Sequence, residues 1–131
     1  MQVGFIGIGV MGRPMILNLL KAEHHVTIYA RHPQKPEVQE VLNSGAKLAP
    51  SSRAVAMASD VVITMLPNSP QVEEVVAGPH GVLEGARKGL IIIDMSTIAP
   101  AVSRKLAQES SIHGAHLLDA PVSGGSQGAI R

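Results

Sequence analysis

Three glycines near the amino terminus have the spacing of a phosphate-binding turn. Residues 3–14 read VGFIGIGVMGRP, an apolar strand that leads into Gly7-x-Gly9-x-x-Gly12 and then into a helix. Gly7 permits the tight turn, Gly9 lets the backbone approach a pyrophosphate, and Gly12 allows the helix to pack closely on the strand. The first N–H groups of that helix and its positive dipole end then face the phosphates. The other interpretation is an ordinary strand-to-helix turn. The intervening residues of the predicted site are Ile8, Val10 and Met11.

The residues after the second predicted strand indicate which dinucleotide fits. An acid at this place binds a ribose 2′-hydroxyl and repels a 2′-phosphate, whereas a nearby arginine favours the phosphate. The chain has Ala30, Arg31 and His32 here, with no carboxylate before Glu37. The planar guanidinium of Arg31 suits a phosphate monoester, and His32 is a second candidate contact. We therefore expect a preference for NADP(H), with NAD(H) as the alternative, unless Arg31 is only a solvated side chain at the rim.

Strands and helices alternate along the chain, which predicts an α/β fold with a parallel sheet covered on both faces. We expect a doubly wound, Rossmann-type sheet of strand order 3-2-1-4-5-6, forming one dinucleotide-binding domain over residues 1–131. Ser51 is the expected N-cap of the third helix. The expected strands are 2–8, 26–30, 46–48, 60–65, 90–94 and 116–119, and the expected helices are 10–22, 36–44, 52–58, 69–76 and 100–110.

Ligands of such a sheet bind beyond the carboxyl ends of its strands, at the switch between strands 1 and 4. The unusual segments of this chain lie at those ends. Structural need alone does not concentrate such residues there, so the pattern favours a nucleotide site. The segments are 7–12, 30–32, 65–68 (which begins with Met65), 94–97 and 119–125.

Composition excludes several other classes of function. The 131 residues are 45% hydrophobic and only 2% aromatic, with a net charge of +1 and no cysteine. A nucleic-acid or membrane-surface role requires a basic face, and stacking on single-stranded bases requires aromatic side chains. Without cysteine there is no disulfide or metal–thiolate site. No signal peptide and no apolar run of membrane-spanning length is visible, so we expect a soluble cytoplasmic protein.

For three other groups of residues, we favour a structural role over a catalytic or metal-binding one. The six histidines lack the spacing of metal ligands, so we predict no metal site. Asp94 and Asp119 end the last two strands, where loop-anchoring hydrogen bonds are favoured over a catalytic carboxylate pair. Four methionines are expected to fill the core, and the first helix is expected to bury one face. The methionines are Met11, Met15, Met57 and Met65, and the buried face is Met11, Met15, Leu19 and Ala22.

The loop after the last strand has the composition of an anion site. It reads DAPVSGG over residues 119–125, and successive glycines let backbone N–H groups converge, with Ser123 adding a hydroxyl donor. A carboxylate fits such a loop, although Ser-Gly-Gly is also typical of a flexible turn.

Taken together, these segments resemble the β-hydroxyacid dehydrogenase family over essentially all 131 residues. GFIGIGVMGRPM over 4–15 is similar to the amino-terminal signature of that family, and residues 119–125 are similar to its substrate-binding segment. ITMLPNSP (63–70) and IDMSTIAP (93–100) are most similar to its tartronate semialdehyde reductase branch. The 3-hydroxyisobutyrate dehydrogenase branch is the alternative.

The resemblance implies roles for further residues. Leu66 and Pro67 would pack beside the riboses, Gln71 would lie near the same edge, and Thr97 would approach the nicotinamide ribose. Ser123, Gly124 and Gly125 would bind the substrate carboxylate. The implied reaction is hydride transfer between the nicotinamide and a short 3-oxo or 3-hydroxy acid, in a protein that is a homo-oligomer.

Two departures from the family pattern affect these expectations. Many relatives have an acid after the second strand where this chain has Ala30, which weighs against NAD(H). The catalytic lysine and the helical second domain of the family lie beyond Arg131, so we predict no catalytic residue within this chain. We expect residues 1–131 alone to bind nucleotide weakly and to turn over little. A non-catalytic NADP(H)-binding module is the alternative of another class.

Overall fold

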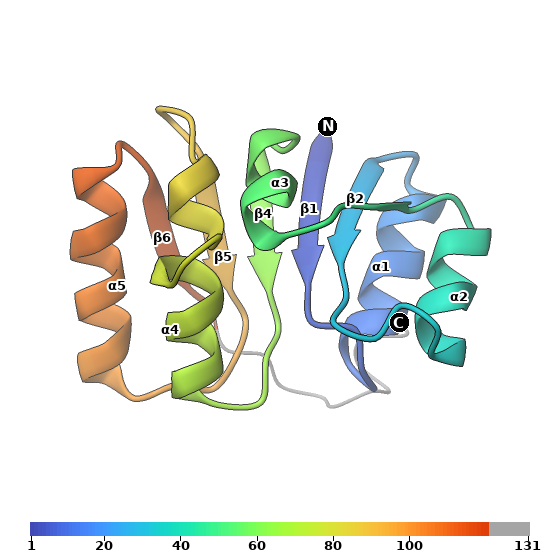
Figure 1. Cartoon of the computed structure of the whole chain (residues 1–131), viewed down its shortest axis with the longest axis horizontal. Helices are drawn as coiled ribbons and strands as arrows, with labels where there is room; N and C mark the ends of the chain where they lie inside the picture. The colour runs from blue at the N-terminus through green and yellow to red at the C-terminus, as the bar shows by residue number, and fades with distance from the viewer. Residues whose placement is uncertain (121–131) are drawn as a thin grey trace.

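The computed structural model describes residues 1–120, which form a six-stranded parallel sheet flanked by helices (Figure 1). The strand order β3-β2-β1-β4-β5-β6 confirms the predicted doubly wound topology. The strands are β1 (Gln2–Ile6), β2 (His25–Tyr29), β3 (Lys47–Leu48), β4 (Val61–Thr64), β5 (Ile91–Asp94) and β6 (His116–Asp119). The helices are α1 (Gly12–Lys21), α2 (Pro36–Asn43), α3 (Ser52–Met57), α4 (Ser69–Ala77), α5 (Pro100–Ile112) and the short 3-10 helix η1 (Val82–Gly85).

Strand β1 lies at the centre of the sheet, between β2 and β4. Phe5 is in register with Ile28 on one side and with Ile63 on the other. Every residue of β1 after Gln2 is buried, as expected for a central strand covered on both faces. A Cβ at Gly4 would overlap Val55 of α3, so this glycine lets α3 pack directly on the strand.

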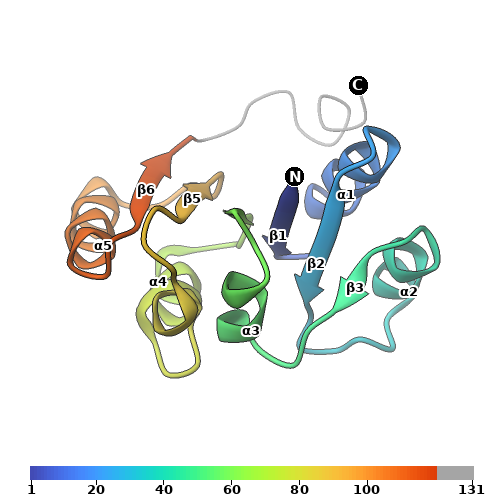
Figure 2. The same ribbon diagram turned by 90° about the horizontal axis from the view of Figure 1, so that it is seen from above.

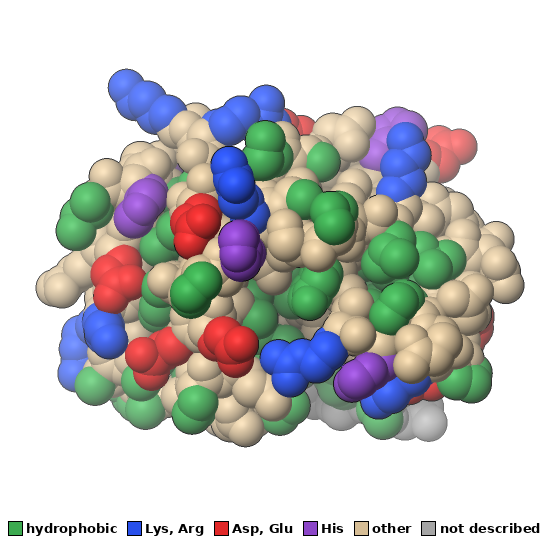
Figure 3. All heavy atoms as spheres, viewed as in Figure 1, with side chains coloured by type: hydrophobic (Ala, Val, Ile, Leu, Met, Phe, Trp, Pro, Cys, Tyr) green, Lys and Arg blue, Asp and Glu red, His purple; other side chains and the backbone are tan. Residues whose placement is uncertain are grey.

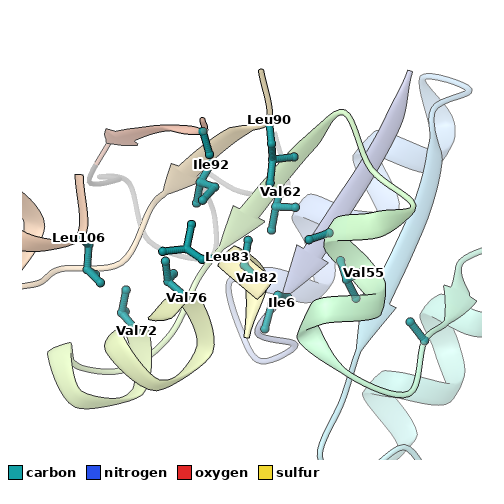
Figure 4. Close-up of a cluster of buried hydrophobic side chains, with 13 residues drawn as sticks. Ile6, Val55, Val62, Val72, Val76, Val82, Leu83, Leu90, Ile92 and Leu106 are labelled. Atoms are coloured by element: carbon teal, nitrogen blue, oxygen red, sulfur yellow. The ribbon is translucent and has the colours of Figure 1, made fainter. Parts of the chain in front are cut away.

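Two hydrophobic clusters cover the two faces of the sheet. On one face, α1 and α2 pack over β1 and β2 around Phe5, Ile16, Ile28 and Val41 (Figure 2). On the other, α3, α4, η1 and α5 enclose a second cluster (Figure 4). Its members include Ile6, Val55, Val62, Val72, Val76, Val82, Leu83, Ile92 and Leu106. Burial of this apolar surface on both faces fixes the sheet and therefore the positions of its strand ends.

The element boundaries differ from expectation mainly at the glycine turn. The first strand was predicted to reach residue 8 but ends at Ile6, because Gly7 has a φ of 111°, outside the extended region. The first helix was predicted from Val10 and begins at Gly12. The glycine segment is therefore longer and more irregular than a simple strand-to-helix junction.

The predicted buried face of the first helix is corrected by the structure. Ile16 is the fully buried side chain of α1, whereas Met15 and Leu19 are partly buried and Ala22 is exposed. Met57 was also expected in the core but is 56% exposed. In both places the packing partners, which sequence periodicity does not reveal, decide which face is covered.

Helix η1 was not predicted. Gly81 precedes it and Gly85 is its last residue, a pattern typical of a loop. Val82 and Leu83 nevertheless bury their side chains against the α3–α4 side of the sheet. Tertiary burial, rather than local propensity, stabilises this turn.

Candidate functional site: a groove at the carboxyl ends of the strands

A groove of about 480 Å³ opens at the carboxyl ends of β1, β2 and β4. This is the switch point of the sheet, where β1 is followed by helices on one face and β4 by helices on the other. In Figure 3, acidic and basic side chains lie side by side near the lower margin, where the strands of Figure 1 end. The groove is lined by residues 6–12, by Tyr29, Ala30, Arg31, His32, Lys35 and Val38, and by Met65, Leu66, Pro67, Gln71, Glu74 and Val75.

The three glycines of the turn differ in what a Cβ atom at each position would contact. A Cβ at Gly7 would overlap the carbonyl oxygen of Met65, and its φ of 111° disfavours other residues. A Cβ at Gly12 would overlap the carbonyl oxygen of Gly7 and lie 3.2 Å from Phe5 Cε1. At Gly9, by contrast, a Cβ would meet no protein atom within 4 Å, and φ is not in the left-handed region. Folding therefore requires Gly7 and Gly12, whereas Gly9 leaves open space in the groove.

The amino terminus of α1 faces this space without a side-chain cap. The Met11 side chain at the N-cap accepts no hydrogen bond, and the first turn contains no acid. Helices α3 and α4 differ, because Ser51 and Asn68 accept hydrogen bonds from the N–H groups of Ala54 and Gln71. The result confirms Ser51 as an N-cap. At α1, the Arg13 N–H donates to the Gly9 carbonyl and Pro14 has no N–H, which leaves the Gly12 N–H and the positive dipole end to receive an anion.

The segment after β2 carries the positive charge of the groove. Ala30, Arg31 and His32 line it as predicted, and Lys35 lies at the same end. Arg31 and Glu74 form an ion pair with 3.8 Å between Nη2 and Oε1. Sequence reasoning missed Lys35, although it lies four residues after Arg31. It also missed Glu74, which the helical period places beside Gln71 on α4.

A buried hydrogen-bond network holds the wall formed by the segment after β4. The hydroxyl of Ser96 accepts a hydrogen bond of 2.7 Å from the backbone N–H of Leu66. Asp94 Oδ1 accepts from Thr64 Oγ1 at 3.0 Å and from the Ser96 N–H at 3.1 Å. The second carboxylate oxygen of Asp94 is buried without a partner among the described residues. Asp94 therefore anchors the loops, as predicted, whereas Asp119 is exposed.

Most of the predicted cofactor residues meet in this groove. The turn from Gly7 to Gly12, the three residues after β2 and the α4 side with Gln71 all contribute. Thr97 is exposed after β5 and does not line the groove. The predicted substrate residues Ser123, Gly124 and Gly125 lie outside the described residues. Within residues 1–120, no three histidine or acidic side chains gather as a metal site.

The fold and the groove define a Rossmann-type dinucleotide-binding domain. Residues 2–131 match the family described as the NAD binding domain of 6-phosphogluconate dehydrogenase. The chain belongs to this family. Within the part that the structure describes, no helix has the length and apolar character needed to cross a membrane.

Curated relatives specify which enzymes of known activity this chain resembles. The chain is 44% identical over 128 residues to 2-(hydroxymethyl)glutarate dehydrogenase of Eubacterium barkeri, covering 98% of this chain and 42% of the relative. It is also 44% identical over 131 residues to 2-hydroxy-3-oxopropionate reductase of Escherichia coli (strain K12), covering 98% of this chain and 43% of that enzyme. These relatives confirm the resemblance to hydroxyacid dehydrogenases. The chain spans about two fifths of their length.

Solved structures agree with this assignment. Mycobacterium tuberculosis 3-hydroxyisobutyrate dehydrogenase superposes with a TM-score of 0.90 at 36% identity, over 98% of this chain and 43% of that one. The protein Psf3, solved in complex with NADP+, superposes with a TM-score of 0.89 at 32% identity, over 98% and 45% of the two chains.

Proposed function

We propose that the intact protein is an oxidoreductase that transfers a hydride between NADP(H) and a short 3-oxo or 3-hydroxy acid. The observation that carries this proposal is the open space at Gly9, beside the uncapped end of α1 in the switch-point groove. When bound, the nicotinamide ring supplies or accepts the hydride. In the reducing direction, the aldehyde group of the 3-oxo acid gains this hydride and one proton and becomes a primary alcohol.

The groove residues would bind and orient the two halves of the coenzyme. Backbone N–H groups of residues 9–12 would bind the diphosphate, and Leu66 and Pro67 would pack against the sugars. The Ser96 bond to the Leu66 N–H keeps that wall in place. We propose that Thr97 contacts the nicotinamide ribose and that Ser123, Gly124 and Gly125 bind the substrate carboxylate.

We further propose that NADP(H) is preferred over NAD(H). Arg31 and Lys35 carry positive charge at the end of the groove after β2, and no acid follows β2 before Glu37. A 2′-phosphate gains charge-assisted hydrogen bonds there that a 2′-hydroxyl does not. The NADP+ complex of Psf3 supports this choice.

The substrate that we propose is tartronate semialdehyde, reduced to D-glycerate. The 2-hydroxy-3-oxopropionate reductase of E. coli, at 44% identity, supports it. Oxidation of 3-hydroxyisobutyrate is the second candidate, supported by the M. tuberculosis enzyme. Steady-state rates of the intact protein with both substrates and both coenzymes distinguish them, and a higher kcat/KM for 3-hydroxyisobutyrate with NAD+ overturns both choices.

Replacement of Gly9 tests the site itself. We expect Gly9→Ala, and more strongly Gly9→Val, to weaken NADPH binding by about tenfold or more, because a side chain there occupies the approach to the diphosphate. Since a Cβ at Gly9 meets no protein atom, the alanine variant keeps its unfolding midpoint. In contrast, Gly12→Ala loses about 1–3 kcal/mol of unfolding free energy, because its Cβ overlaps the Gly7 carbonyl. Unchanged NADPH titration curves for both Gly9 variants contradict the proposal.

A non-catalytic NADP(H)-binding module predicts a different result. Such a protein binds NADPH but needs no carboxylate loop, so Ser123→Ala leaves all its properties unchanged. We propose instead that Ser123→Ala raises the KM for the acid substrate. We also propose that the intact protein is a cytoplasmic homo-oligomer, which light scattering after gel filtration and cell fractionation test.

A further inference from the structure

A carboxylate lies at the end of the groove where positive charge would receive the 2′-phosphate. Among the described residues that line the groove, Glu74 is the only acid, and Arg31 and Lys35 are the only lysine or arginine. Glu74 comes from α4 and Arg31 from the segment after β2, so their ion pair of 3.8 Å joins opposite walls of the groove. The carboxylate therefore occupies one side of the guanidinium that the coenzyme needs.

We propose that Glu74 is a specificity-determining residue that competes with the 2′-phosphate for Arg31. It thereby lowers the affinity for NADP(H) while leaving that for NAD(H) unchanged. The inference rests on the proposed function, since it requires that the adenosine half of the coenzyme lies beside Arg31.

The geometry and charges of the Arg31–Glu74 pair indicate that Glu74 competes with the 2′-phosphate for Arg31 and does not help to bind it. The pair distance of 3.8 Å exceeds the 2.7–2.9 Å of a strong charge-assisted hydrogen bond, which a phosphate dianion can form with the same fork. A phosphate bonded to the nearer nitrogen lies within about 7 Å of the Glu74 carboxylate if neither side chain moves. Like charges at that distance repel, whereas a neutral 2′-hydroxyl meets no such repulsion.

Exposure sets the size of the effect. The Arg31 and Glu74 side chains are 69% and 64% exposed, so water and salt screen both their attraction and the repulsion of the phosphate. We therefore expect a change of about threefold to tenfold in affinity rather than a loss of binding. The effect should shrink as ionic strength rises.

The neighbouring residue supplies a matched control. Glu73 lies on the same helix but pairs with Lys105 of α5 at 3.4 Å and does not line the groove. Glu73→Gln and Glu74→Gln change the net charge equally. The probes are NADP+, NAD+ and 2′,5′-ADP, titrated into the intact protein by calorimetry at low and at physiological salt.

We expect Glu74→Gln to bind NADP+ and 2′,5′-ADP about threefold to tenfold more tightly at low salt, with NAD+ unchanged. Glu73→Gln should match the unsubstituted protein within twofold. In an Arg31→Ala background the gain from Glu74→Gln should disappear, because the partner for which the two anions compete is gone.

Several results would overturn the inference. Unchanged or weaker NADP+ binding by Glu74→Gln does so, as does an equal gain for NAD+, an equal gain from Glu73→Gln, or a full gain without Arg31. Each of these leaves the proposed function intact if the unsubstituted protein binds NADPH. If that protein binds neither dinucleotide, the proposed function fails together with the inference.

Discussion

At the scale of single residues, short backbone and hydroxyl contacts shape the groove. The Ser96 hydroxyl is fully buried and accepts the Leu66 N–H, so it determines where the Leu66–Pro67 wall lies. Thr97 is the next residue but is exposed. Of these two neighbouring residues, Ser96 therefore has a structural hydroxyl, whereas Thr97 is a candidate ligand contact.

Replacing each hydroxyl tests this difference. Ser96→Ala leaves the Leu66 N–H without its acceptor, and we expect a loss of about 1–3 kcal/mol of unfolding free energy. Thr97→Ala should stay within about 0.5 kcal/mol, because the residue is exposed. Urea denaturation of the two variants measures both values. Equal stabilities would show that the Ser96 bond does not hold the wall.

At the scale of elements, backbone hydrogen bonds join the end of β5 to both of its neighbours, and a buried side-chain hydrogen bond joins it to β4 as well. Asp94 and Asp119 are in register at the ends of β5 and β6. Asp94 is buried and links β5 to Thr64 at the end of β4, whereas Asp119 is exposed. The same residue type at matched positions thus has different structural roles.

We expect the same substitution to lower the unfolding free energy at Asp94 and to leave it nearly unchanged at Asp119. Asp94→Ala leaves the Thr64 hydroxyl and the Ser96 N–H without an acceptor, so we expect a loss of about 2–4 kcal/mol. Asp94→Asn keeps an acceptor oxygen and should lose less. Asp119→Ala, being exposed, should change the unfolding free energy by less than about 0.5 kcal/mol. Thermal and urea unfolding check the order, and a neutral Asp94→Ala refutes the anchoring role.

At the scale of the whole molecule, two hydrophobic clusters hold a sheet whose carboxyl edge carries the groove. Among the described residues that line it, the charged side chains are Arg31, Lys35 and Glu74, all at the end that would receive the adenosine. We predict that the general acid for a substrate carbonyl comes from outside these groove residues, so that coenzyme binding and proton transfer are separable properties.

This separation predicts the behaviour of residues 1–131 as an isolated polypeptide. We expect weak NADPH binding and a reductase rate about 10²–10⁴ below that of a full-length relative, the E. coli 2-hydroxy-3-oxopropionate reductase, because a positioned general acid contributes a factor of that size. Fluorescence titration measures binding, and NADPH consumption with tartronate semialdehyde measures turnover. A rate comparable to that of the full-length relative would contradict the expectation.

The sequence by itself determined the class of fold, the strand order and the glycine turn. Each depends on local signals, namely β-branched runs, helical spacing and residues with special backbone freedom. Gly7 and Gly12 are such cases, because their close contacts lie within the strand–turn–helix unit or at its neighbouring strand end. The predicted cofactor residues of the turn and of the segment after β2 accordingly meet in one groove.

Only the tertiary structure decided which side chains are buried and which groups meet across the groove. Ile16 is buried on α1 and Met57 is exposed on α3, because the neighbouring elements determine which helix face is covered. The pair of Arg31 and Glu74 joins residues 43 positions apart, and no local pattern encodes that contact. Asp94 and Asp119 likewise look alike in sequence, and only the packing around β5 buries one and leaves the other exposed.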